Sequence, residues 1–88
     1  MEGALETRAL ASLSVDEVCR VLCKLDLGRY AAAFRALPVN GAMLAAVDSA
    51  DDLREVGVEV AIHRKMLLRR VEDFREGGVP QELLVSVP

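Results

Sequence analysis

The stretch from Val60 to Glu76 constrains the fold of this chain more than any other. On a helix with about 3.6 residues per turn, its large apolar residues Leu67, Val71 and Phe74 share one face. Charged residues occupy the opposite face, namely Lys65, Arg69, Glu72 and Glu76. This distribution is typical of an amphipathic helix with one side buried in a core. The sequence therefore predicts a long helix over residues 60–76.

Charge changes sign where this helix begins. Residues 48–59 hold five acids and one base, whereas residues 60–71 hold four bases and no acid. Arg64 and Lys65 lie in the first turns of the helix, where the helix dipole disfavours cations. Ile62 and Met66 lie one turn apart beside these charges, as in an interface with an apolar centre and a charged rim. The alternative, that Ile62 packs inward under the turn at Gly57, stays open.

Composition limits the fold class and several functions. A chain of 88 residues forms one small domain, and 52% hydrophobic residues with only 3% aromatics favour a helical core of Leu, Val and Ala. We therefore expect an all-α domain. A net charge of −3 argues against a general nucleic-acid or membrane-surface binder. Because the sequence shows neither a long apolar run nor a signal-peptide pattern, we expect an intracellular, cytoplasmic location.

Capping residues divide the segment before the long helix into shorter helices. Ser14 and Glu17 have the spacing of a capping box, which predicts a helix from Val15 to Leu25 with Leu13 packing before its start. A second helix is predicted over residues 29–37, and Pro38 ends it.

Two further short helices follow in the sequence. Asn40 caps a third helix that runs to Val47, and Ser49 caps a fourth, with Asp52 in the reciprocal capping position. The predicted inward residues are Met43, Leu44 and Val47 in the third helix and Leu53 and Val56 in the fourth. Gly57 marks the end of the fourth helix.

The remaining segments are predicted to flank the domain. Residues 1–12 lack an apolar stripe and are expected to form a frayed tail or a loosely docked turn. Gly77, Gly78 and Pro80 end the last helix, so residues 77–88 are expected to be a tail or linker. The helical domain is thus expected over residues 13–76.

No set of residues suggests catalysis or a bound cofactor. His63 is the only histidine and falls on the apolar side of its helix, so we expect it to pack or hydrogen-bond. Cys19 and Cys23 lie four residues apart on one predicted helix, a poor geometry for a disulfide, and are expected to be reduced thiols. No metal site, no cofactor and no enzymatic activity are predicted.

The acidic segment admits three interpretations. Its carboxylates are Asp48, Asp51, Asp52, Glu55 and Glu59. The positive end of a helix stabilises Asp51 and Asp52 without any partner, but it does not account for Asp48, Glu55 and Glu59. A surface that faces a protein partner and a merely solvated surface both remain open. A cation site is disfavoured because the ordered loop pattern of a calcium hand is missing.

The order of these features resembles the sterile alpha motif (SAM) domain family from about Leu13 to Phe74. The matching residues are Ser14 to Val18, Leu27, Tyr30 and Phe34, Val39 to Gly41, Leu44, Asp52 to Val58, His63 to Lys65, Leu67, Leu68 and Val71. The resemblance implies a compact bundle of five helices, four short and one long. It also implies a non-catalytic adaptor or scaffold domain in signalling.

SAM domains commonly pair head to tail, and the resemblance implies two faces for such pairing here. The first is an acidic mid-loop face with Asp48, Asp51, Asp52 and Glu55, and the second is a basic end-helix face with Ile62, Arg64, Lys65, Met66 and Arg69. The expected partner is another SAM domain or a second copy, giving a homo-oligomer. The alternative is an RNA hairpin bound by Arg64, Lys65, Arg69 and Arg70, and membrane insertion is not expected.

Overall fold

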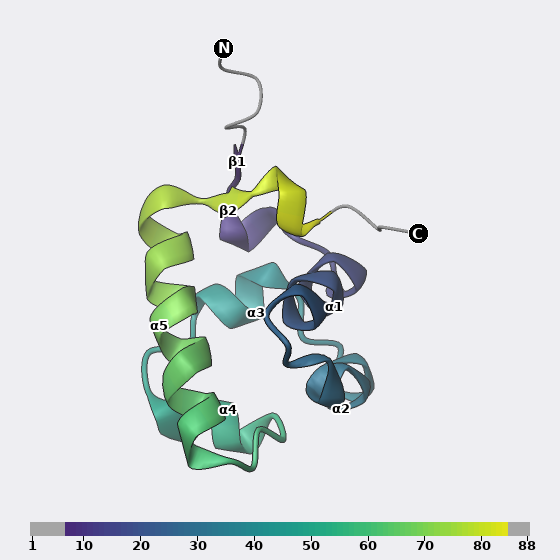
Figure 1. Cartoon of the computed structure of the whole chain (residues 1–88), viewed down its shortest axis with the longest axis vertical. Coiled ribbons are helices and arrows are strands. Elements are labelled where there is room, and N and C mark those ends of the chain that lie inside the picture. The colour runs from purple at the N-terminus through teal and green to yellow at the C-terminus, as the bar shows by residue number, and fades with distance from the viewer. Residues whose placement is uncertain (1–6, 85–88) are drawn as a thin grey trace.

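Five α-helices form the body of the computed structural model within the residues that it describes, 7–84 (Figure 1). They are α1 (Val15–Lys24), α2 (Ala31–Ala36), α3 (Gly41–Ala45), α4 (Ala50–Glu55) and α5 (Ala61–Gly77). Short 3-10 turns add η2 (Leu10–Ser12), η3 (Gly28–Tyr30) and η4 (Gln81–Leu83), and a minimal sheet pairs β1 (Thr7–Arg8) with β2 (Val79–Pro80). The all-α class with a long last helix is confirmed.

Local signals in the sequence set most helix ends. The Ser14 hydroxyl accepts a hydrogen bond from the Glu17 N–H, and the Glu17 carboxylate accepts one from the Ser14 N–H, as the capping box predicted. Asn40 and Ser49 cap α3 and α4 through their side chains. Gly57, with φ of 102°, turns the chain from α4 toward α5 in a conformation that other residues rarely adopt.

The core draws one face from each helix. Its fully buried large side chains include Leu22 and Val18 of α1, Phe34 of α2, Leu53 of α4, and Leu67 and Val71 of α5. Among the described residues no polar or charged side chain is buried. The core therefore depends on apolar packing, and charged residues are available only for the surface.

Two helices are shorter than the sequence predicted, and one residue that was predicted to point inward is exposed. The predicted second helix divides into η3 and α2, and α3 ends at Ala45 instead of Val47. Adjacent residues of a helix point about 100° apart, and α3 turns Leu44 inward and leaves Met43 47% exposed. Val47 is still buried, but from the loop that follows α3.

Both predicted flanking segments differ from expectation where the structure describes them. Thr7 and Arg8 pair with Val79 and Pro80, so the two ends of the described chain lie side by side (Figure 1). Three apolar side chains of these segments are buried, namely Leu10, Val79 and Leu84. Residues 7–12 and 79–84 are therefore part of the packed domain. The remainder of the predicted tails, residues 1–6 and 85–88, lies outside the described residues.

Close packing against η2 explains the glycine that begins α3. A Cβ at Gly41 would lie 2.0 Å from the Leu10 carbonyl oxygen and 2.8 Å from the Leu13 N. The Gly41 N–H also donates a hydrogen bond of 2.8 Å to the Leu13 carbonyl. The N-terminal segment thus approaches α3 at backbone distance, which only glycine permits.

Candidate functional site

The first two turns of α5 display apolar side chains to solvent. Ile62 is 58% exposed and Met66 is 48% exposed, one helical turn apart. The alternative that Ile62 packs inward is therefore wrong. Lys65 and Arg69 are also exposed and follow the neighbouring line of the helix. We call Ile62 and Met66 the apolar ridge of α5.

Arg64 has a different position from the other predicted end-helix residues. Its Nη1 donates hydrogen bonds of 2.9 Å to the carbonyl oxygens of Val58 and Glu59, and the residue is half-buried. These bonds tie the start of α5 to the turn after α4. Arg64 thus has a structural role that the sequence pattern did not indicate.

The apolar ridge has cations on both sides. On one side, Lys65 and Arg69 border a depression that also contains Leu68, Glu72 and Asp73. On the other side, Met66 and Arg70 border a hollow together with Lys24 at the end of α1 and Asp26 in the turn that follows. The sequence analysis missed Lys24, because only the folded arrangement brings the end of α1 near Met66 and Arg70 of α5.

The predicted acidic residues gather on α4 and the loop before it. Asp48, Asp51 and Glu55 are exposed, and Asp51 and Glu55 lie one turn apart on α4. Asp52 is half-buried because its Oδ2 accepts a hydrogen bond of 3.2 Å from the Asp48 N–H. The Asp52 carboxylate, which was predicted to accept a hydrogen bond from the Ser49 N–H, thus accepts one from the Asp48 N–H instead. Asp52 stabilises the loop, and the other three carboxylates are free to face a partner.

A hollow of about 280 Å³ opens beside these acids between α3 and α4. Its lining is mainly apolar and comprises Val39, Met43, Leu44, Val47 and Val56, with Asp52 at its edge. Met43, predicted to point inward, lies here at the surface. Val56, predicted to be buried, is half-buried here. We call this feature the α3–α4 hollow.

Ion pairing within the chain does not use either charged surface. Between residues 7 and 84 the salt bridges join Arg8 to Glu17 and Arg35 to Asp16. Hydrogen bonding to Arg35 lowers the pKa of Asp16, and hydrogen bonding to the Ser14 backbone lowers that of Glu17. Both pairs belong to α1 and its neighbours. The acids of α4 and the exposed bases of α5 therefore retain charge that the fold itself does not pair.

His63 and the cysteines have structural surroundings. The Tyr30 hydroxyl and His63 Nδ1 are 2.6 Å apart, and their rings pack edge to face. Burial raises the pKa of the Cys19 thiol, which disfavours the reactive thiolate. Cys19 and Cys23 are both free thiols. His63 thus packs and hydrogen-bonds as expected from its helical position.

The part of the chain that the structure describes contains neither a metal-binding cluster nor a membrane-spanning helix. Across residues 7–84 no group of three or more His, Cys, Asp or Glu side chains has a geometry that holds a metal ion. In the same part of the chain no helix combines the length and apolar character needed to cross a bilayer.

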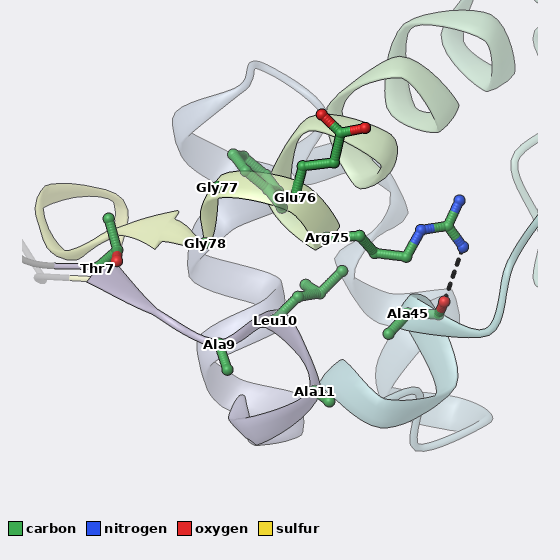
Figure 2. Close-up of a pocket in the computed structure, with 10 residues that line it drawn as sticks. Thr7, Ala9, Leu10, Ala11, Ala45, Arg75, Glu76, Gly77 and Gly78 are labelled. Atoms are coloured by element: carbon green, nitrogen blue, oxygen red, sulfur yellow. Dashed lines mark hydrogen bonds between the residues drawn. The ribbon is translucent and has the colours of Figure 1, made fainter.

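A further hollow, of about 440 Å³, lies at the other end of the domain (Figure 2). Small residues line much of it, including Ala9, Ala11, Ala45 and Gly77. Arg75 at its edge is held in place, since its Nη1 donates hydrogen bonds of 2.8 Å to the carbonyls of Ala45 and Val47. This arrangement links the last turns of α5 to the end of α3.

Comparison with known proteins identifies the family. The family model described as SAM domain (Sterile alpha motif) matches residues 12–75, which is more than half of the chain. Neither the curated proteins nor the solved structures gave a match. SAM domains are in general protein-interaction modules without catalytic activity. The chain belongs to the SAM (sterile alpha motif) domain family.

Proposed function

We propose that this domain is a non-catalytic adaptor that pairs head to tail with another SAM domain, or with further copies of itself. In this proposal the acidic side of α4, with Asp48, Asp51 and Glu55, meets the basic start of α5, with Lys65 and Arg69. Such a domain would serve as a scaffold inside a larger intracellular signalling protein.

The observation that carries the proposal is the exposure of the α5 ridge. Ile62 and Met66 are two of the most exposed large apolar side chains in the described chain, and they lie among cations. A monomer gains nothing from placing them in water, and cations at a helix start reduce its stability slightly. A protein partner with an acidic surface gives both features a use.

Charge complementarity in this pair contributes mainly orientation and association rate. The exposed acids of α4 attract a basic partner surface over roughly one Debye length, about 8 Å at physiological salt. Because opposite faces of one molecule meet different neighbours, repeated pairing of the same chain gives open chains instead of closed dimers.

Two charge reversals test the proposal without disturbing the fold. Lys65→Glu places an acid near the start of α5, and Glu55→Lys places a base at the end of α4, and the helix dipole favours both changes. Each variant should lose pairing at low salt in sedimentation experiments with a SAM partner or with itself. Mixing the two should restore a complex, because each retains one intact face.

Arg64→Ala serves as a contrasting variant. Arg64 donates hydrogen bonds to the Val58 and Glu59 carbonyls. Its removal should therefore act mainly by lowering the melting temperature, and only to a smaller extent by changing the charge of a binding surface. If both charge reversals left pairing with every tested SAM domain unchanged, the proposed function would be wrong.

Binding of an RNA hairpin is the second candidate, and one new observation favours it. Lys24 joins Arg70 beside Met66, which extends the basic surface beyond α5. Against it stand the adjacent acids Glu72 and Asp73, and no exposed aromatic side chain offers a stacking platform within residues 7–84. A labelled stem-loop titrated at two salt concentrations separates the candidates, because phosphate contacts weaken steeply with salt.

A further inference from the structure

Two segments outside the family match close one end of this domain. β1 pairs with β2 in an antiparallel register that sets Thr7 opposite Pro80. In the later segment, the side chains of Val79 and Leu84 are buried. We call β1, β2 and η4 the terminal clasp. All of the terminal clasp lies outside residues 12–75, to which the family model applies, so family membership does not account for it.

We propose that the terminal clasp is a latch that holds α3 in position, so that opening of the clasp loosens the α3–α4 hollow and leaves the start of α5 intact. The consequence for binding rests on the proposed function, in which the acidic side of α4 beside this hollow meets a partner. The latch itself is a property of the single molecule and does not depend on pairing.

The terminal clasp reaches the start of α3 through η2. Only Ala9 separates β1 from η2, and the packing of η2 against α3 is the most extensive between any two elements of the described chain. The Gly41 N–H donates a hydrogen bond of 2.8 Å to the Leu13 carbonyl, and the Leu10 carbonyl leaves no room for a side chain on Gly41. A shift of β1 that displaces η2 therefore acts directly on the backbone that begins α3.

The end of α3 is held from the same side of the domain. Arg75 lies in the last turn of α5, and its Nη1 donates hydrogen bonds of 2.8 Å to the carbonyl oxygens of Ala45 and Val47. Figure 2 shows the first of these bonds. Gly78, with φ of 84°, then turns the chain into β2, and a Cβ on Gly78 would lie 2.9 Å from the Thr7 hydroxyl oxygen. The last turn of α5 thus connects the terminal clasp to the carbonyl end of α3.

Both supports matter because α3 is too short to be stable alone. It has five residues, whereas isolated helices shorter than about 12 residues are marginal in water. Met43 and Leu44 of α3, with Val47 after it, form one wall of the α3–α4 hollow. Loss of the supports would therefore distort the hollow and move the adjoining Asp48. The start of α5 lies at the other end of the molecule and keeps its own hydrogen bonds from Arg64 (Figure 1).

The contacts of the terminal clasp allow it to open before the rest of the domain. Its sheet has two residue pairs, and a pair of strands of this size is marginally stable by itself. The Arg20 side chain donates a long hydrogen bond of 3.3 Å to the Leu84 carbonyl. Opening breaks these contacts and none of the backbone hydrogen bonds within the five helices. It is therefore a local event that requires less free energy than global unfolding.

Hydrogen exchange of α3 amides tests the latch in the full chain. Val79→Ala weakens the terminal clasp, and Val58→Ala is the matched control, because both valines are fully buried and Val58 lies between α4 and α5. Exchange at the Gly41 and Leu44 amides should be about tenfold faster in Val79→Ala and within about twofold of the unaltered chain in Val58→Ala. Equal acceleration by both variants would show that α3 opens only with the whole domain and would overturn the inference.

A disulfide lock provides the converse test. Thr7→Cys with Pro80→Cys places two thiols on directly opposed residues of the sheet, and antiparallel partners have Cα separations that a disulfide spans. Cys23→Ser in the same chain removes the exposed native thiol, whereas Cys19 is buried. Oxidation should slow exchange at the Gly41 amide by about tenfold or more relative to the reduced form of the same molecule. Exchange at Gly41 that is equal in both forms would overturn the inference.

A variant with the clasp forced open connects the latch to binding. Val79→Asp with Leu84→Asp places charges in the terminal clasp, and retained amide protection in α5 would show that the domain is still folded. This variant should bind Lys65→Glu as the unaltered chain does, because that contact uses its intact start of α5. It should bind Glu55→Lys at least about tenfold more weakly, because that contact needs its acidic side.

The binding experiment distinguishes failure of the latch from failure of the proposed function. Weakening of both complexes to the same extent, or of neither, would overturn the link between the terminal clasp and the acidic side of α4. If the unaltered chain bound neither Lys65→Glu nor Glu55→Lys, pairing between copies would fail, and the two exchange experiments would still decide whether the latch exists.

Discussion

Apolar side chains are buried at one end of this domain and exposed at the other. At the end where β1 pairs with β2, the side chains of Leu10, Val79 and Leu84 are buried, although these residues lie outside the family match. At the start of α5, Ile62 and Met66 lie inside the family match and are exposed. Figure 1 shows the β1–β2 pair and the start of α5 at opposite ends of the molecule. The contrast supports the proposal that the β1–β2 end serves folding and the start of α5 serves binding.

The largest expected effect on stability is at the end of the domain where β1 pairs with β2. Gly41→Ala places a Cβ against the Leu10 carbonyl and the Leu13 N, so α3 or η2 must move. We expect a loss of about 3 kcal/mol in the free energy of unfolding, measured by urea denaturation. The exposed glycine Gly77, whose added Cβ would contact nothing within 4 Å, is the control and should change stability far less when replaced by alanine.

A matched pair of truncations compares the two ends directly. Leu84→Ala removes a side chain that is 4% exposed and should cost about 2–3 kcal/mol, whereas Met66→Ala removes one that is 48% exposed and should cost under about 0.5 kcal/mol. Thermal melts of the two variants provide the measurement. Equal costs would remove the distinction between a folding end and a binding end.

Much of this contrast was predictable, and the part that was not depends on long-range packing. The capping residues Ser14, Asn40 and Ser49 predicted helix starts because the signal lies within a few residues. The ridge of Ile62 and Met66 was predicted because helical periodicity places them away from the buried face.

Local capping signals and helical periodicity could not predict the burial of the terminal segments or the position of Lys24. Val79 and Leu84 follow a pair of glycines and carry no periodic pattern, and they are buried because α1 and β1 happen to lie beside them. Lys24 reaches the surface beside Met66 only because the fold brings the end of α1 near α5. The inward position predicted for Met43 was wrong for a related reason, since the packing of α3 against η2 decides which side of this short helix is buried.

A fall in pH is expected to lower the free energy of unfolding through the capping box at the start of α1. Hydrogen bonds from the Ser14 N–H and from Arg8 hold the pKa of Glu17 below its ordinary value of 4.5. A carboxyl group with a lowered folded-state pKa contributes stability above its ordinary pKa, and that stability is lost as the pH falls through the folded pKa. Unfolding free energies of the unaltered chain and Glu17→Gln should therefore differ by about 1 kcal/mol at neutral pH and converge once the pH falls below the folded-state pKa of Glu17. A difference that persists in acid would assign the effect to packing instead of charge.

The smallest effect has the opposite sign and lies at the binding end. Lys65→Glu exchanges a cation for an acid within the first turns of α5, whose start has no side-chain cap. The helix dipole should then raise the unfolding free energy by about 0.3 kcal/mol or more, measured at low salt, where the variant is monomeric. Glu72→Lys, an exchange beyond the middle of the same helix, is the control and should lack this gain. A variant that is more stable yet fails to pair would show that Lys65 is retained for binding at the expense of folding, whereas a loss of stability would place Lys65 with the structural residues of the opposite end.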